Sequence, residues 1–248
     1  MKITLSARAA IIGLFLTALL AGAAQAEIPD TFTNLKIFPK DIGKRHLMGA
    51  MRDFSTSLGV RCTHCHVQKT PGDFDSIDWA SDNLEYKEVA RGMMAMVRKI
   101  NSEQLPNATG KQGAKVKCIT CHRGLEDPRT LEMVLLDTIE KDGADVGIAR
   151  YGELSDEYYG SGSYDFSPST LTSVAEVLAQ SHGDLESAVK VLNLAVETNP
   201  DDMPSHLMRS QVMIIHGDKE GALASAHEVL RIEPDNQVAQ KIIEQLEN

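Results

Sequence analysis

Apolar residues recur every three or four positions in two stretches of the N-terminal half, and this spacing predicts two amphipathic helices. The first helix is expected to begin near Asp41 and to end at Gly59, a residue type common at helix C-termini. Its apolar stripe consists of Leu47, Met51, Phe54 and Leu58.

The second predicted helix begins at Ser81 or Asp82, because Asp82 and Glu85 have the spacing of a capping box. Its apolar stripe consists of Tyr86, Val89, Met93, Met96 or Val97, and Ile100. Residues 67–80 and 101–117 contain turn-forming proline and glycine and are predicted to be loops.

The C-terminal third contains an internal repeat of 34 residues, the period of tetratricopeptide repeats. The matching features are Gly183-Asp184 with Gly217-Asp218, Asn199-Pro200-Asp201 with Glu233-Pro234-Asp235, and Ala188 with Ala222. The small residues allow paired helices to approach, and each proline ends a helix. A final helix over 237–246 is expected to cap the repeats. Glu176 departs from the repeat pattern, which usually has a small residue there.

The region between the two halves gives mixed signals. A short helix is predicted over 131–139, with Gly143 and Gly147 ending it. The stretch 151–166 is rich in tyrosine, glycine and serine, which suits either a hinge or a packing segment. Residues 127–167 are therefore assigned to a linker.

The first 26 residues have the pattern of a secretory signal peptide: basic Lys2 and Arg8, an apolar run over 9–21, and a small-residue cleavage site at 24–26. An uncleaved anchor is the alternative, but the apolar run is short for a membrane span. Without this segment, 23 basic residues face 35 acidic ones, a formal charge of −12. That sign disfavours nucleic-acid binding and favours a basic protein partner. We expect a periplasmic protein with no transmembrane span.

All four cysteines of the chain lie in two short motifs of the same form. These are Cys62-Thr-His-Cys65-His66 and Cys118-Ile-Thr-Cys121-His122. Two cysteines separated by two residues and followed by histidine form the attachment signature of c-type haem. Each thiol forms a thioether with the porphyrin and the histidine ligates the iron. Zinc binding and a redox disulfide are the alternatives, but neither explains a histidine after both pairs. We therefore predict two covalently bound haem c groups.

A six-coordinate haem needs a second axial ligand, and methionine on the helix before each motif can supply it. Met51 is the preferred candidate for the first haem, with Met48 one turn away as the alternative. His46 and His64 are further candidates, of which His64 is the weaker because it lies inside the attachment loop.

Three segments resemble the cytochrome c subunit of photosynthetic reaction centres and its non-photosynthetic relatives. They are MRDFSTSLGVRCTHCH over 51–66, ARGMMAMVRKIN over 90–101 and CITCHRG over 118–124. The resemblance covers residues 30–126 and implies helix–loop–haem units in which the upstream methionine is the sixth ligand. Transferred to this chain, the metal ligands are His66 with Met51 and His122 with Met93, with Met96 as the alternative to Met93. This chain has two motifs where the photosynthetic subunit has four, lacks the lipidated N-terminal cysteine and has a different C-terminal half. A general electron carrier is therefore expected rather than a light-driven role.

The expected fold is mainly α: a signal peptide over 1–26, a dihaem cytochrome c domain of helix–loop–haem units over 27–126, a linker over 127–167, and tetratricopeptide-like repeats over 168–248. The expected function is transfer of single electrons between redox partner proteins, which is not an enzymatic activity. A dihaem peroxidase is the enzymatic alternative, and a cytochrome-maturation helper is a third. The acidic repeats are expected either to dock a partner or to serve as a helical stabiliser.

Overall fold

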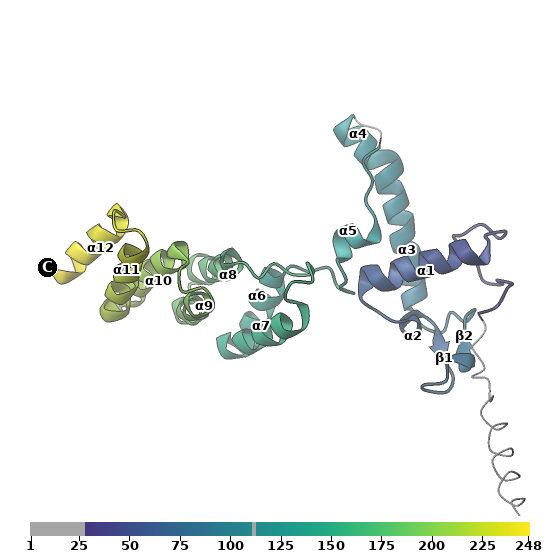
Figure 1. Ribbon diagram of the computed structural model, residues 1–248, viewed down its shortest axis with the longest axis horizontal. Coiled ribbons are helices and arrows are strands. Elements are labelled where there is room, and N and C mark those ends of the chain that lie inside the picture. Colours follow the sequence, from purple (N-terminus) through teal and green to yellow (C-terminus); the bar gives the residue numbers. More distant parts are fainter. Residues whose placement is uncertain (1–27, 111–112) are drawn as a thin grey trace, which may run out of the picture. The chain divides into compact units, whose positions relative to one another are not determined.

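The computed structural model describes residues 28–110 and 113–248, which form two compact units that are each described separately. The first unit contains residues up to Arg52 and 61–115, and the second contains 53–60 and 116–248. The predicted signal peptide lies outside the described residues. Both units are mainly helical, as expected (Figure 1).

The first unit is built from the helices that the apolar stripes predicted. Helix α1 (Lys44–Leu58) begins three residues after the expected start. It is followed, as expected, by Gly59, whose φ of 69° is the left-handed conformation that glycine adopts readily. Its last residues belong to the second unit. The single turn α2 (Cys62–Cys65) follows the end of α1 closely.

Residues 67–80 are more ordered than the loop that the sequence predicted. Strands β1 (Val67–Gln68) and β2 (Ile77–Asp78) pair antiparallel, with Val67 opposite Asp78, and the 3₁₀ turn η1 (Phe74–Ser76) lies between them.

Helix α3 (Tyr86–Lys99) begins later than predicted, because Asp82 does not cap it. The Asp82 carboxylate instead accepts hydrogen bonds from Arg91, at 2.9 Å, and from Lys36, also at 2.9 Å. These cations, together with Asn34, hold the pKa of Asp82 well below its ordinary value. The carboxylate is thus committed to a tertiary charge network that the local capping pattern does not reveal.

The helical backbone continues beyond α3, so the loop expected after residue 100 was wrong for its first part. A π turn, η2 (Ile100–Gln104), continues α3 directly into α4 (Leu105–Thr109). The turn is closed by a hydrogen bond from the Leu105 N–H to the Ile100 carbonyl. Pro106 follows it, and a proline ring within a regular α-helix would press on the carbonyl four residues earlier. The wider turn accommodates that residue, and Gly110 then ends the helix with a φ of 61°.

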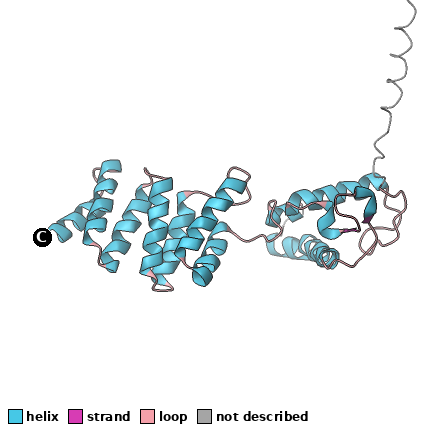
Figure 2. Cartoon of the chain, turned by 90° about the horizontal axis from the view of Figure 1, so that it is seen from below, coloured by secondary structure: helices cyan, strands magenta, loops and turns pink. Residues whose placement is uncertain are grey.

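The second unit contains the single turn α5 (Cys118–His122) and a row of longer helices. These are α6 (Leu131–Asp142), α7 (Ala144–Tyr158), α8 (Pro168–Gln180), α9 (Leu185–Thr198), α10 (Met203–His216), α11 (Lys219–Ile232) and α12 (Gln237–Glu247). Helices α6–α12 lie side by side in chain order (Figures 1 and 2).

The 34-residue repeat corresponds to two helical hairpins, α8–α9 and α10–α11, followed by α12. Ala188 and Ala222, the matching small residues, are both completely buried. Asp184 and Asp218 cap the second helix of each hairpin by accepting hydrogen bonds from backbone N–H groups. Glu176, the residue that departs from the repeat pattern, is exposed on α8 and accepts a hydrogen bond from Gln180.

The range 127–167, expected to be a linker, contains a third hairpin, α6–α7. Its residues Leu135 and Leu154 share one hydrophobic core with Leu171 of α8 and Leu192 of α9. Gly147 was expected to end a helix, but it is instead buried within α7. A Cβ atom at Gly147 would overlap the side chain of Ile139, so a glycine lets α6 and α7 approach.

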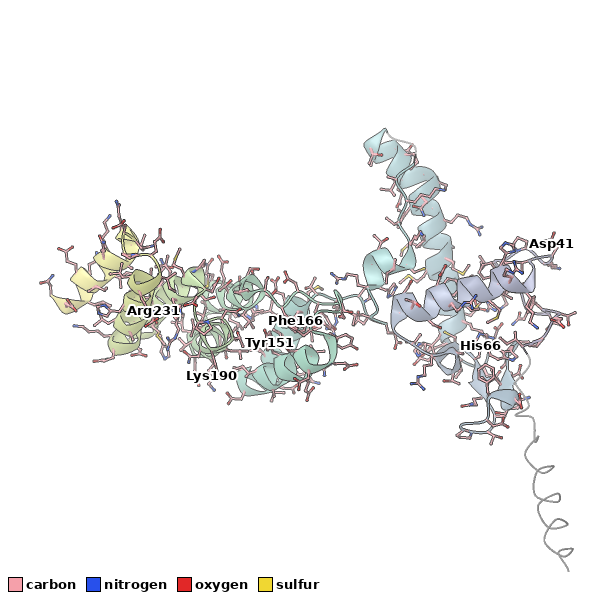
Figure 3. The ribbon with its side chains drawn as sticks, in the orientation of Figure 1. Asp41, His66, Tyr151, Phe166, Lys190 and Arg231 are labelled. Atoms are coloured by element: carbon pink, nitrogen blue, oxygen red, sulfur yellow. The ribbon has the colours of Figure 1, made fainter. Side chains whose placement is uncertain are left out.

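The tyrosine-rich segment packs against this same core. Tyr151 and Phe166 meet edge to face with ring centroids 5.7 Å apart (Figure 3), and Tyr158 and Tyr164 do so at 5.4 Å. Lys190 of α9 pairs with Asp145 of α7 at 3.1 Å. These contacts fix the α6–α7 hairpin to the repeats.

Candidate functional site

The first motif presents both of its thiols from one helical turn. Cys62 and Cys65 open and close α2, and residues three apart lie on the same side of a helix. Neither cysteine forms a disulfide. His66 follows the turn with extended backbone (φ −114°, ψ 130°).

The ring of His66 is held by one nitrogen. Its Nδ1 lies 3.2 Å from the carbonyl oxygen of Trp79, and because a carbonyl only accepts, Nδ1 carries the proton. The lone pair is therefore on Nε2, the nitrogen available to a metal. Burial, and to a lesser extent the Lys87 ammonium, lowers the pKa of His66 to about 4, so the ring is neutral at pH 7.

Two aromatic rings and a lysine surround this histidine (Figure 3 labels His66). The Trp79 ring meets the His66 ring edge to face at 5.0 Å, and Phe74 meets Trp79 at 5.3 Å. The Lys87 ammonium donates to the same Trp79 carbonyl at 2.9 Å and also to the Ser81 carbonyl. Lys87 carries no signal of this position in the sequence.

The second motif shares the spacing of the thiols and the hydrogen bond of the histidine. Cys118 and Cys121 lie three residues apart on α5, again without a disulfide. His122 Nδ1 lies 2.9 Å from the carbonyl oxygen of Leu125, so its proton is also on Nδ1 and its lone pair on Nε2. Both histidines are thus oriented by a backbone carbonyl, a partner for which the sequence carries no signal.

The first unit has almost no hydrophobic core of its own. Within its described residues, Leu47 and Ile77 are the only buried hydrophobic side chains. Helix α3 instead exposes an apolar stripe whose members are Tyr86 (38% exposed), Val89 (57%), Met93 (38%) and Met96 (49%). An apolar stripe of this size is ordinarily covered. These features fit a large planar apolar group, such as a porphyrin, held beside the attachment motif.

The candidate sixth ligands lie on the two predicted helices. Met51 and Met48 are both half-buried on α1. On α3, Met93 and Met96 are on the exposed stripe, whereas Met94 is half-buried on another face. The choice of methionine at each motif stays a prediction.

The histidines considered as alternative ligands lie elsewhere on these elements. His64 stacks against Tyr86 with ring centroids 4.0 Å apart, and His46 is exposed at the start of α1. Within residues 28–110 and 113–248, no cluster of three or more histidine, cysteine or acidic side chains is arranged to hold a metal ion.

Comparison with known proteins agrees with these features. The family model described as photosynthetic reaction centre cytochrome C subunit matches residues 73–150. Cytochrome c-554 of Chloroflexus aurantiacus is 37% identical over 78 residues, which is 32% of this chain and 16% of that protein. The photosynthetic reaction center cytochrome c subunit of Thermochromatium tepidum is 32% identical over 104 residues, 40% of this chain and 22% of that protein. The chain is related to c-type cytochromes.

The relationship to these cytochromes is partial. The chain spans less than a quarter of the length of the curated relatives, and the family model includes the second motif but begins after the first. A solved structure, the first TPR of Spaghetti (RPAP3) bound to an HSP90 peptide, matches with a TM-score of 0.32 and 20% identity, covering 47% of this chain and 89% of that chain.

In the part of this chain that the structure describes, no helix combines the length and the apolar character needed to cross a membrane.

Proposed function

We propose that the chain is a periplasmic dihaem c-type cytochrome that transfers single electrons between redox partners. The observation that carries the proposal is the shared state of His66 and His122. At both motifs a backbone carbonyl accepts a hydrogen bond from the protonated Nδ1 and leaves Nε2 as the ligand, beside two thiols on one helical turn. A haem bound there supplies a one-electron Fe(III)/Fe(II) couple.

The residues of each motif have separate tasks in this proposal. The cysteines hold the porphyrin covalently, and the histidine holds the iron through Nε2. Met51 and Met93 close the sixth positions and exclude other ligands. Methionine ligation opposite histidine raises the reduction potential, so a fairly oxidising carrier is expected. Closed sixth positions also distinguish an electron carrier from a peroxidase, which needs one open position.

The proposed location follows from the N-terminal sequence. The basic start, apolar run and small-residue cleavage site over 1–26 are those of an export signal, and c-type haem is attached outside the cytoplasm. An export signal and two haem attachment motifs in one chain are therefore consistent with each other.

Two measurements on protein purified from the periplasm test the proposal. Intact mass should equal the chain from residue 27 plus two haem groups. A redox-titrated visible spectrum should show low-spin haem in both oxidation states. A double variant, Cys118→Ala with Cys121→Ala, should keep one haem and serves as the one-site control. A bare polypeptide mass, or bound zinc, contradicts the cytochrome; high-spin haem favours the peroxidase.

The C-terminal hairpins are proposed to be tetratricopeptide-like repeats that dock a basic redox partner. Charge is divided unevenly along the chain: residues 27–125 contain 15 basic and 11 acidic residues, whereas residues 126–248 contain 8 basic and 24 acidic residues. The α6–α7 hairpin shares the acidic character of the repeats. A field of this sign steers a cationic partner and raises the association rate more than the affinity.

Charge variants test docking better than truncation does, because a cut at residue 168 would divide the core that α6–α9 share. We expect the triple variant Glu197→Gln, Glu220→Gln, Glu244→Gln, all at exposed positions of the repeats, to slow electron exchange with a basic cytochrome and to flatten its salt dependence. Asp73→Asn with Asp75→Asn, in the first unit, is the control. Equal rates and salt slopes in all three proteins contradict docking and leave the repeats as a stabiliser.

A further inference from the structure

The backbone directly after the second motif adopts a left-handed turn. Arg123 has φ 51° and ψ 30°, and Gly124 has φ 88°. Among the described residues, Arg123 is the only one other than glycine with a positive φ. The left-handed conformation costs free energy in a residue with a Cβ atom, so the surroundings must hold it.

Two hydrogen bonds hold this turn, and both act on the same peptide group. The carbonyl oxygen of Arg123 accepts a bond from Ser163 Oγ at 2.7 Å, and the N–H of Gly124 donates to the Ser57 carbonyl at 2.9 Å. The peptide group is planar and trans, so its carbonyl and N–H point in opposite directions. The group is therefore clamped between the last turn of α1 and the loop that follows α7.

This clamp, formed by Ser57 and Ser163 on the Arg123–Gly124 peptide group, is buried and closely packed. Ser57 and Ser163 are only 6% and 4% exposed. A Cβ atom at Gly59 would overlap the Gly124 carbonyl, and one at Gly124 would lie 3.4 Å from Ser163 Oγ. Little room is left for the peptide group to rotate.

Leu125, the residue directly after Gly124, holds the ring of His122. Leu125, 5% exposed, donates its N–H to the His122 carbonyl at 2.8 Å, and its own carbonyl accepts from His122 Nδ1 at 2.9 Å. The clamped Arg123–Gly124 peptide group lies one peptide group before Leu125 and therefore restricts the position of the Leu125 carbonyl.

We propose that Ser163 is a positioning residue for the second haem, which acts through the Arg123–Gly124 peptide group on the hydrogen bond between Leu125 and His122. This inference rests on the proposed function, since it concerns the ligand of a haem. A firm Nδ1 hydrogen bond makes Nε2 a stronger electron donor, which favours the oxidised iron and lowers its potential. The loop after α7 thereby tunes the second haem.

The test measures the reduction potentials of both haems in the full-length holoprotein. Ser163→Ala should raise the potential of one haem and leave the other unchanged. We expect at least a threefold change in its oxidation equilibrium, about 28 mV for one electron. Ser163→Thr keeps the hydroxyl and should restore the original value. Ser163→Val has the shape of threonine without the hydroxyl and should behave like alanine.

The matched control is Ser210→Ala. Ser210 is also fully buried and its hydroxyl donates to a backbone carbonyl, that of Ala222, at 2.8 Å. It should leave both potentials unchanged. Unchanged potentials in Ser163→Ala and Ser163→Val, or an equal shift in Ser210→Ala, overturn the inference. An unmodified protein whose mass shows fewer than two haems contradicts the proposed function instead, so the two failures are distinguishable.

Discussion

Lys87 and His66 share one acceptor, the carbonyl oxygen of Trp79, at 2.9 Å and 3.2 Å respectively. At the second motif the corresponding distance, from His122 to the Leu125 carbonyl, is 2.9 Å. A shared acceptor binds the His66 proton less strongly, and the ammonium charge favours the reduced form of a nearby iron. In the proposed dihaem protein, both effects would raise the potential of the first haem relative to the second.

Replacing Lys87 with methionine should therefore lower the potential of the first haem. The Trp79 carbonyl is then left to His66 alone, and one positive charge is removed. We expect a shift of up to about 60 mV, a tenfold change for one electron, in a potentiometric titration. Lys69→Met removes an exposed lysine of the same unit, paired with Asp78 at 3.6 Å, and should change the potential little. A raised potential in Lys87→Met would contradict this account.

The sixth ligand of the first haem can be found by truncating one methionine at a time. Met51→Ala should open the iron, remove the weak thioether band at the red end of the oxidised spectrum, and allow the reduced protein to bind carbon monoxide. Met48→Ala is the comparison one turn away. If only Met48→Ala opens the site, the ligand assignment is wrong by one helical turn.

The second assignment is tested on α3 in the same way. Met93→Ala should make one haem reactive toward carbon monoxide, and Met96→Ala should do so only if the alternative ligand is used. Met94→Ala is the control, since Met94 is half-buried on another face of the helix. Reactivity in Met94→Ala alone would exclude both candidates on the apolar stripe.

Removal of the haems should affect the two units unequally. The first unit buries Leu47 and Ile77 as its only core side chains within the described residues, whereas α6–α9 share a large core of aliphatic residues. A quadruple Cys→Ala variant should therefore lose hydrogen-exchange protection over residues 28–52 and 61–110 and keep it over 131–248. Equal protection in both regions would show that the first unit folds without its cofactor.

The core shared by α6–α9 can be tested by a single truncation. Leu171→Ala removes a side chain that is 1% exposed and should lower the free energy of unfolding by about 2–5 kcal/mol, measured by urea unfolding followed by circular dichroism. Met133→Ala, at a position 51% exposed, should cost well under 1 kcal/mol by the same measurement. Both variants should keep the haem spectra of the parent protein.

Sequence predicts the parts of this protein that local patterns determine. The stripes of α1 and α3 follow from the spacing of apolar residues, and the helical hairpins from the 34-residue period. Helix α6 was predicted over 131–139, but α7 was missed because Gly147 has the appearance of a helix breaker, and only the contact with Ile139 explains this glycine. Asp82 was expected to cap a helix because of its spacing to Glu85. Its observed partner, Arg91, is nine residues away and outside any local motif.

The residues that orient the histidines of the candidate site were harder to predict from the sequence than the cysteines and histidines themselves. Cysteine and histidine in a fixed spacing identify the attachment motifs, but every residue has a carbonyl, so nothing distinguishes Trp79 or Leu125 as partners of the histidines. Lys87 has the appearance of an ordinary surface lysine in a helix. Ser163 lies 40 residues from Arg123, the residue whose carbonyl it bonds.

The π turn at Ile100–Gln104, which joins α3 to α4, makes the number of residues between these helices critical. One π turn is equivalent to one residue inserted into an α-helix, and each residue rotates the remainder of the helix by about 100°. Deleting a single residue here would restore regular winding and turn Leu105–Thr109 to a different side of the axis. It would also place the Pro106 ring against a carbonyl in the preceding turn. Related sequences should therefore tolerate substitutions at 100–104 far better than one-residue gaps.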